Sequence, residues 1–147
     1  MSENEIYVPP IRPNEVAPPP RILYSMMGEQ NIRQLLADFY SELEKSEIRD
    51  MFAKDMFKAS QKNADFFIGL LGGPAIYHQK YGNPMMRARH MPFTITESAR
   101  DVWLGCFVKA VSDAVADQRF PKEYVEPFTE FLAGFSMWMV NTAEAKE

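Results

Sequence analysis

The chain has 147 residues, of which 46% are apolar and 13% aromatic, so it can bury one sizeable core, and its length favours one domain. Its formal net charge of -4 and its lack of any block of Lys and Arg argue against a broad nucleic-acid-binding surface. The lone Cys106 excludes an internal disulfide and fits a reducing cytoplasm, and the sequence predicts neither a secretory signal nor a membrane-spanning run of about 18 apolar residues.

Proline dominates the start of the chain. Residues 1–20 contain six of the eleven prolines, which lack an amide donor and disfavour helix in the residue before them. We therefore expect residues 1–20 to form an extended, partly disordered arm and residues 21–147 to form the folded domain.

Helical spacing of apolar residues begins after the arm. A short first helix through Ile22, Leu23 and Met26 is expected to stop at Gly28. The next helix is clearer, because its apolar residues recur every three or four positions on one stripe, with Tyr40 at the edge. The residues of this stripe are Ile32, Leu35, Leu36, Phe39 and Leu43. A brief helical turn through Ile48 and Met51-Phe52 should follow.

A further helix is predicted from Met56 to Leu71. Gly72-Gly73-Pro74 should end it, because glycine permits left-handed dihedrals and proline cannot continue the hydrogen-bond ladder. Its expected inward residues are Phe57, Ala64, Phe67, Leu70 and Leu71, flanked by Ala59, Asn63 and Phe66. We expect residues 74–84 to form a loop, and Pro84 to start a short helix over Met85–His90 that ends before Pro92.

Two more helices are expected in the last third of the chain. Thr94 or Thr96 can cap the first of them, and the second follows Pro121 and Pro127. The buried stripe of the first consists of Trp103, Cys106, Phe107, Ala110, Val111 and Ala114. The inward residues of the second are Phe128, Phe131, Leu132, Phe135, Trp138 and Met139. No sustained period-two alternation occurs, so we predict an all-α fold.

Both histidines of the chain lie within residues 72–93, in a segment rich in Gly, Pro and Arg. Haem needs an axial ligand on a rigid element, an apolar slot and cationic or hydroxyl groups at its rim, and this segment can supply all three. His90 is favoured over His78 as the iron ligand, because its second ring nitrogen can donate to a backbone carbonyl of the preceding helical turn. Arg87 and Arg89 lie close enough to reach the haem propionates.

Simpler interpretations of the same residues stay open at this point. A lone histidine beside arginines is more often an ordinary solvated or core histidine, and Trp103 at helical spacing is more often core than pocket. No His and Cys cluster has zinc spacing, and no phosphate-binding glycine loop occurs. Cys106, on a buried stripe, is interpreted as an inert apolar thiol.

A set of motifs runs through the second half of the chain: Gly72-Gly73-Pro74, Tyr77, Tyr81-Gly82, Pro84-Met85, Arg87-Ala88-Arg89-His90, Pro92-Phe93, and Arg100-Asp101 before Trp103-Leu104. With these motifs the sequence resembles the group II truncated haemoglobins, from about Ile22 to Asn141. The resemblance implies a shortened globin fold, a two-over-two helical sandwich around one haem b, with His90 as the proximal iron ligand.

The resemblance also implies the remaining site residues. Tyr40 falls at the family's helix B tyrosine, Trp103 at its distal tryptophan, and Phe52 at the aromatic residue that packs on the haem face. Counting back from Gly72 places three residues of the distal helix toward the iron: Ala59, Asn63 and Phe67. The matching propionate partners are Lys62, Tyr77 and Arg89. Asn63 departs from the family, in which this position is more often apolar or a glutamine.

These residues predict a protein that binds oxygen and other small diatomic ligands reversibly. Tyr40 and Trp103 can each donate a hydrogen bond to a ligand that takes on negative charge, and at roughly 1 to 3 kcal/mol per donor they would slow oxygen release by a few orders of magnitude. The alternative is a redox enzyme that converts oxygen and nitric oxide to nitrate, or that uses peroxide. Both need an unidentified reductase, and the protein is expected to be a monomer or homodimer. A third hypothesis is a sensor whose proline-rich arm contacts a partner.

Overall fold

The structure is a computed structural model that describes residues 11, 12 and 15–144, and over these residues it is helical with no strand. The long helices are α1 (Leu23–Glu44), α2 (Met56–Leu70), α5 (Glu97–Ala116) and α6 (Val125–Met139). The short ones are α3 (Ile76–Tyr81), α4 (Met86–His90) and the 3-10 helices η2 (Arg49–Met51) and η3 (Lys122–Tyr124). The predicted all-α fold is confirmed. None of the described helices is long and apolar enough to cross a membrane.

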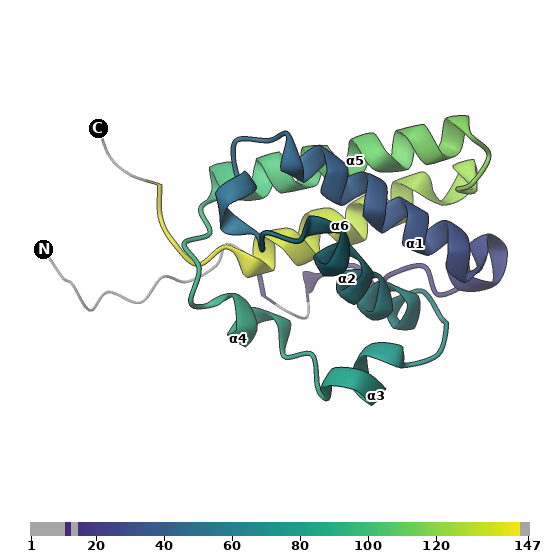
Figure 1. Cartoon of the computed structure of the whole chain (residues 1–147), viewed down its shortest axis with the longest axis horizontal. Helices are drawn as coiled ribbons and strands as arrows, with labels where there is room; N and C mark the ends of the chain where they lie inside the picture. The colour runs from purple at the N-terminus through teal and green to yellow at the C-terminus, as the bar shows by residue number, and fades with distance from the viewer. Residues whose placement is uncertain (1–10, 13–14, 145–147) are drawn as a thin grey trace, which may run out of the picture.

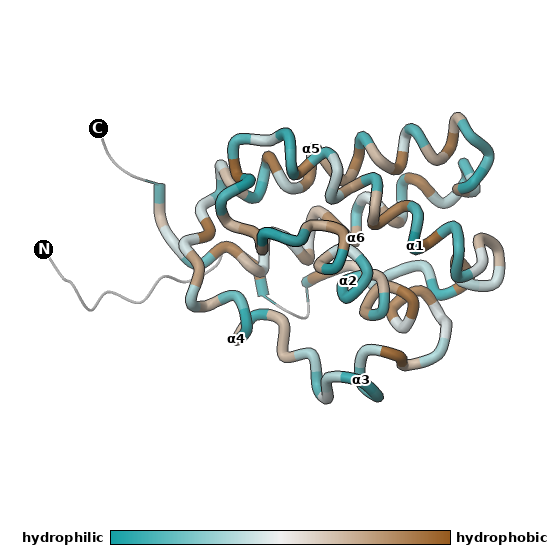
Figure 2. The backbone as a smooth tube through the Cα atoms, viewed as in Figure 1, coloured by the Kyte–Doolittle hydropathy of each residue, from teal (hydrophilic) through white to brown (hydrophobic). Residues whose placement is uncertain are grey.

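The four long helices form two layers (Figure 1). Helix α1 packs on α2 and on α5, and α5 packs on α6, which gives the two-over-two arrangement that the resemblance implies. Figure 2 shows hydrophobic and hydrophilic stretches alternating along α1 and α5, as expected for helices that bury one face. Of the predicted arm, residues 1–10, 13 and 14 lie outside the described residues, and Val16 packs against the core.

Phenylalanine rings from all four long helices meet at the centre of the core. Phe39 of α1, Phe67 of α2, Phe107 of α5 and Phe128 of α6 are fully buried. The centroid of the Phe107 ring lies 4.1 Å from that of Phe39, 5.3 Å from that of Phe67 and 5.7 Å from that of Phe128. Phe107 therefore contacts one ring from each of the other three long helices.

We expect Phe107→Ala to lower the free energy of unfolding by about 3 to 5 kcal/mol, because it leaves a cavity among three rings. Urea denaturation measures this loss. Val108→Ala is the matched control, since Val108 is the next residue of α5 and is exposed. Its free energy of unfolding should change by less than about 0.5 kcal/mol. Similar losses for the two variants would contradict the central role of Phe107.

Several predicted helix boundaries are confirmed. The helix breaks at Gly28, whose φ of 81° is left-handed, although helical turns lie on both sides of it. Gly72, at the end of α2, has a φ of 101°, and a Cβ there would lie 2.0 Å from the carbonyl oxygen of Arg21. Thr96, one of the two predicted caps, begins α5 by accepting a hydrogen bond from the amide of Ala99. At position 72, glycine is needed for two reasons: the backbone angles are left-handed, and the chain before α1 passes too close to leave room for a Cβ.

The predicted loop over residues 74–84 is wrong, because Ile76–Tyr81 form helix α3. Tyr77 of this helix is buried, and its ring centroid lies 5.8 Å from that of Phe66 on α2. A six-residue helix is too short to be stable alone or to show a clear period, so its stability comes from packing against α2.

Two other residues differ from expectation. Phe57 was predicted to face inward, but its side chain is 68% exposed. Met56 takes the inward position instead, four residues before the buried Ser60, and Phe57 lies about 100° further round the helix. Pro127 lies within the first turn of α6 rather than before it. The first four amides of a helix have no intrahelical acceptor, so a proline there removes no hydrogen bond.

Candidate functional site

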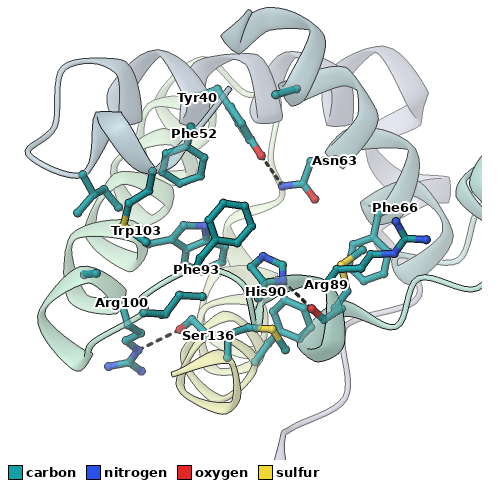
Figure 3. Close-up of a pocket in the computed structure, with 18 of the residues that line it drawn as sticks. Tyr40, Phe52, Asn63, Phe66, Arg89, His90, Phe93, Arg100, Trp103 and Ser136 are labelled. Atoms are coloured by element: carbon teal, nitrogen blue, oxygen red, sulfur yellow. Dashed lines mark hydrogen bonds between the residues drawn. The ribbon is translucent and has the colours of Figure 1, made fainter. Parts of the chain in front are cut away.

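A cavity of about 400 Å³ lies beside α4 and between the two layers (Figure 3). Its volume is within the roughly 300 to 1,000 Å³ that is usual for small-molecule and cofactor sites. The structure brings ten of the predicted site residues to its wall: Tyr40, Phe52, Ala59, Lys62, Asn63, Phe67, Tyr77, Arg89, His90 and Trp103. No Asp or Glu side chain is among the described lining residues.

His90 projects into the cavity from the last residue of α4 (Figure 3). Its Nδ1 lies 2.6 Å from the carbonyl oxygen of Met86, one turn earlier, as the sequence predicts. A ring nitrogen that donates to a carbonyl carries the proton, so Nε2 retains its lone pair. The hydrogen bond thus orients the ring and leaves Nε2 able to bind a metal. His78 is exposed and does not line the cavity.

The end of α6 holds α4 in place. Asn141 Nδ2 donates to the carbonyl oxygens of His90, at 3.2 Å, and of Phe93, at 2.9 Å. Arg87 does not line the cavity, in contrast to its predicted role as a propionate partner, because its guanidinium donates to the carbonyl oxygens of Trp138 and Val140. Arg87 therefore anchors the histidine helix rather than reaching a ligand.

Across the cavity from His90, Tyr40 of α1 and Asn63 of α2 form a polar pair (Figure 3). Asn63 Nδ2 donates to the Tyr40 hydroxyl oxygen at 3.3 Å. Burial raises the pKa of the Tyr40 phenol to about 12, while the hydrogen bond from Asn63 acts in the opposite direction. The phenol is therefore protonated at neutral pH. Because its oxygen accepts from Asn63, its own O–H remains to donate.

Trp103 of α5 borders the same side of the core. Its ring packs edge-on against Phe39 and Phe107, with centroids 5.3 Å and 5.5 Å apart. Phe52 packs edge-on against Tyr40, with centroids 5.9 Å apart. Trp103 lines the cavity, and its indole N–H takes part in none of the hydrogen bonds between described residues. These contacts fix the positions of two donors, one phenolic and one indolic.

Cations and tyrosine rings form one edge of the cavity. Lys62 Nζ lies 4.7 Å from the centre of the Tyr81 ring, and the Arg89 guanidinium carbon lies 5.9 Å from the centre of the Tyr77 ring. The two tyrosine rings are 4.9 Å apart. Three predicted propionate partners, Lys62, Tyr77 and Arg89, are thus connected in one cluster, in which the Tyr81 ring lies between Lys62 and Tyr77.

Sequence reasoning did not place Arg100 and Ser136 at the cavity. Arg100 Nε donates to Ser136 Oγ at 3.0 Å, and its Nη2 donates to the carbonyl oxygen of Ala133 at 2.8 Å. Arg100 precedes Trp103 by three residues on the same face of α5, and this spacing was the available signal. Other lining residues without a predicted site role are Ile48, Met51, Ala53, Phe66, Met86, Phe93, Ile95, Ala99, Phe135 and Met139.

Cys106 lies outside the cavity lining. Burial raises the pKa of its thiol, with Glu42 acting in the same direction. A higher pKa lowers the thiolate fraction, which accords with the predicted inert thiol.

Comparison with known proteins places the chain among haem proteins of one kind. The profile of the bacterial-like globins matches residues 22–140. The group 2 truncated haemoglobin YjbI of Bacillus subtilis is 34% identical over 125 residues, which cover 84% of this chain and 92% of that protein. The group II truncated haemoglobin of Bacillus anthracis superposes with a TM-score of 0.76 at 34% identity, over 83% of this chain and 92% of that one. A structure described as the truncated oxygen-avid haemoglobin of Bacillus subtilis superposes with a TM-score of 0.74 at 32% identity, over 80% and 98%.

Proposed function

Because the chain belongs to the bacterial-like globin family and is a haem-binding globin of the group II truncated type, we propose that its cofactor is haem b. We further propose that it binds oxygen and other small diatomic ligands reversibly and with high affinity. The observation that carries the proposal is the position of Tyr40 and Trp103, two hydrogen-bond donors on the wall of the cavity that His90 enters.

The residues of the cavity fit haem. Within the described residues no three His, Cys, Asp or Glu side chains gather to hold a metal ion, so a metal at His90 needs ligands from a cofactor. Haem would supply an iron atom with four ligands of its own, so that one histidine would complete its attachment to the protein and leave it able to bind a diatomic ligand. His90 Nε2 would be the histidine ligand. Lys62, Tyr77 and Arg89 would bind the propionates.

Each residue of the distal side has a separate task. Asn63 donates to the Tyr40 oxygen, which directs the phenolic proton away from Asn63. Tyr40 and Trp103 then donate toward a ligand that carries partial negative charge, and hydrogen bonds to charged acceptors are stronger than neutral ones. Phe52 and Phe67 provide apolar wall, which excludes water and strengthens both hydrogen bonds. The likeness to a haemoglobin described as oxygen-avid supports the same conclusion.

The rate of oxygen release from the ferrous, haem-loaded protein tests the proposal. We expect stopped-flow dissociation to be slow in the wild type and faster by roughly two orders of magnitude when both donors are lost, in Tyr40→Phe/Trp103→Phe. Fast release that is the same in both proteins would contradict it. Steady consumption of nitric oxide with a reductase present would favour the enzymatic alternative.

A further inference from the structure

Charge is unevenly distributed along the chain, and the cavity lies in its positive part. Residues 49–89 hold seven Lys and Arg against three Asp, a formal charge of +4, although the whole chain carries -4. All other residues together therefore carry -8. The charged side chains on the cavity wall are Lys62, Arg89 and Arg100, with no carboxylate among the described lining residues.

Most cations of this positive segment form no ion pair with a described residue. Of its seven Lys and Arg, only Lys80 does so, with the buried Asp65. Arg49 donates instead to backbone carbonyls, among them those of Ala53 and Lys54, and Arg89 donates to the carbonyl of Pro84. Backbone carbonyls satisfy donors but carry no net charge, so these cations keep a positive field.

Four exposed cations at or near one edge of the cavity are Lys54, Lys58, Lys62 and Arg89, and we call them the cationic rim. Lys58 and Lys62 are one turn apart on α2, and Lys54 precedes that helix. Stacked rings connect Lys62 to Arg89, because Lys62 lies over Tyr81, Tyr81 packs on Tyr77, and Arg89 lies over Tyr77.

The carboxylates of residues 49–89 offset only part of the charge of the rim, because exposed Asp55, which lies between Lys54 and Lys58 in the chain, sets one negative charge against four positive ones. Asp55 caps α2 by accepting a hydrogen bond from the amide of Lys58. Asp65 is buried and pairs with Arg33 and Lys80. Asp50 lies on η2 and is exposed. The rim therefore keeps an excess of positive charge.

We propose that the cationic rim is the docking surface for a small acidic protein that donates one electron to the haem. The inference rests on the proposed function, because reversible oxygen binding needs ferrous iron and ferric iron must be reduced. In this step the donor loses one electron and ferric iron gains it, and no covalent bond forms or breaks. Lys62 and Arg89 are the proposed propionate partners, so a donor on the rim approaches that edge of the cofactor.

The distribution of charge favours a small acidic protein as the partner over an extended anionic surface such as a membrane. Electron-transfer complexes are transient and have small interfaces, and electrostatic steering raises their association rates. The charge of -8 outside residues 49–89 repels acidic partners from other faces, which orients a small donor at the rim. The same charge opposes an extended anionic surface such as a membrane. Two propionates would neutralise Lys62 and Arg89, so Lys54 and Lys58, offset in part by Asp55, supply the steering charge.

The experiment uses the haem-loaded protein and a flavodoxin, a small acidic electron donor, as the probe. The rim variant is Lys54→Glu/Lys58→Glu. The matched control, Lys109→Glu/Lys122→Glu, makes the same change of charge at exposed residues of α5 and η3, which do not line the cavity. Two quantities are measured at low and high ionic strength: the binding of oxidised flavodoxin by calorimetry, and the rate at which reduced flavodoxin reduces the ferric protein.

At low ionic strength, we expect the rim variant to bind oxidised flavodoxin at least ~10-fold more weakly than wild type does, and to be reduced at least ~10-fold more slowly. Both quantities should change by less than ~3-fold in the control. High salt should slow the wild type toward the rim variant. Equal losses in rim and control variants, or a wild-type rate independent of salt, would overturn the inference. So would rim-dependent binding to phosphatidylserine vesicles without binding to flavodoxin. A missing Soret band instead contradicts the proposed function, and the absorption spectrum shows this before any flavodoxin is added.

Discussion

Replacing His90 with alanine is expected to abolish normal haem ligation, the largest effect of any substitution considered for this chain. The chain has two histidines, and only His90 lines the cavity. Its Nδ1 is occupied by the Met86 carbonyl, so the ring is oriented for a single role through Nε2. The absorption spectrum of the variant after haem supplementation measures the effect. We expect a weak or shifted Soret band and rapid loss of haem to an acceptor protein.

Two further variants control this result. His78→Ala removes the exposed histidine and should leave the spectrum unchanged. His90→Gly leaves a space at the ligand position, and added imidazole should restore the wild-type spectrum in it. A normal spectrum in His90→Ala together with a lost one in His78→Ala would show that the iron ligand is His78.

The second large effect is expected at Tyr40. Tyr40→Phe removes one hydroxyl from a buried position and keeps the ring that packs against Phe52. Loss of a donor worth about 1 to 2 kcal/mol should speed oxygen dissociation roughly 5- to 30-fold. Flash photolysis and stopped-flow mixing give the dissociation rate. Tyr24→Phe, in the same helix but off the cavity, should leave it unchanged.

A double-mutant cycle shows whether the two donors act on one ligand atom. If Tyr40 and Trp103 both donate to the same oxygen, the effects of Tyr40→Phe and Trp103→Phe should differ from their sum in the double variant. Asn63→Ala adds a separate measurement, because it frees the Tyr40 oxygen from its hydrogen bond without removing either donor. Strictly additive effects would mean that the two donors do not act on the same ligand atom.

The long helices could be predicted from the sequence, because their buried residues repeat over many turns. Positions on α2 could also be assigned by counting back from Gly72. Helix α2 runs without interruption from Met56 to Leu70, so the spacing from Gly72 is that of a regular helix. Ala59, Lys62 and Asn63, assigned in this way, do line the cavity. His90 could be found because the chain has only two histidines to offer a haem iron.

What could not be predicted depends on contacts between distant segments. Helix α3 has six residues, and Tyr77 packing on Phe66 stabilises it, which no local pattern records. Arg87 and Arg89 look equivalent in the sequence, yet the carbonyls at the end of α6 take Arg87 away from the cavity. Ser136 joins the site through Arg100, which is 36 positions distant in the chain.

The bonds from Asn141 give the histidine helix a dynamic property. The side-chain amide of Asn141 donates to the carbonyl oxygen of His90. The backbone amides of Asn141 and Thr142 both donate to the carbonyl oxygen of Ile95. Local unfolding of the chain after α6 is therefore expected to release the helix that carries His90 as well, so that the two form one cooperative unit. Deuterium exchange at the amides of Asn141 and Thr142 should report a common free energy of opening, and haem binding at His90 should raise that free energy although neither residue lines the cavity.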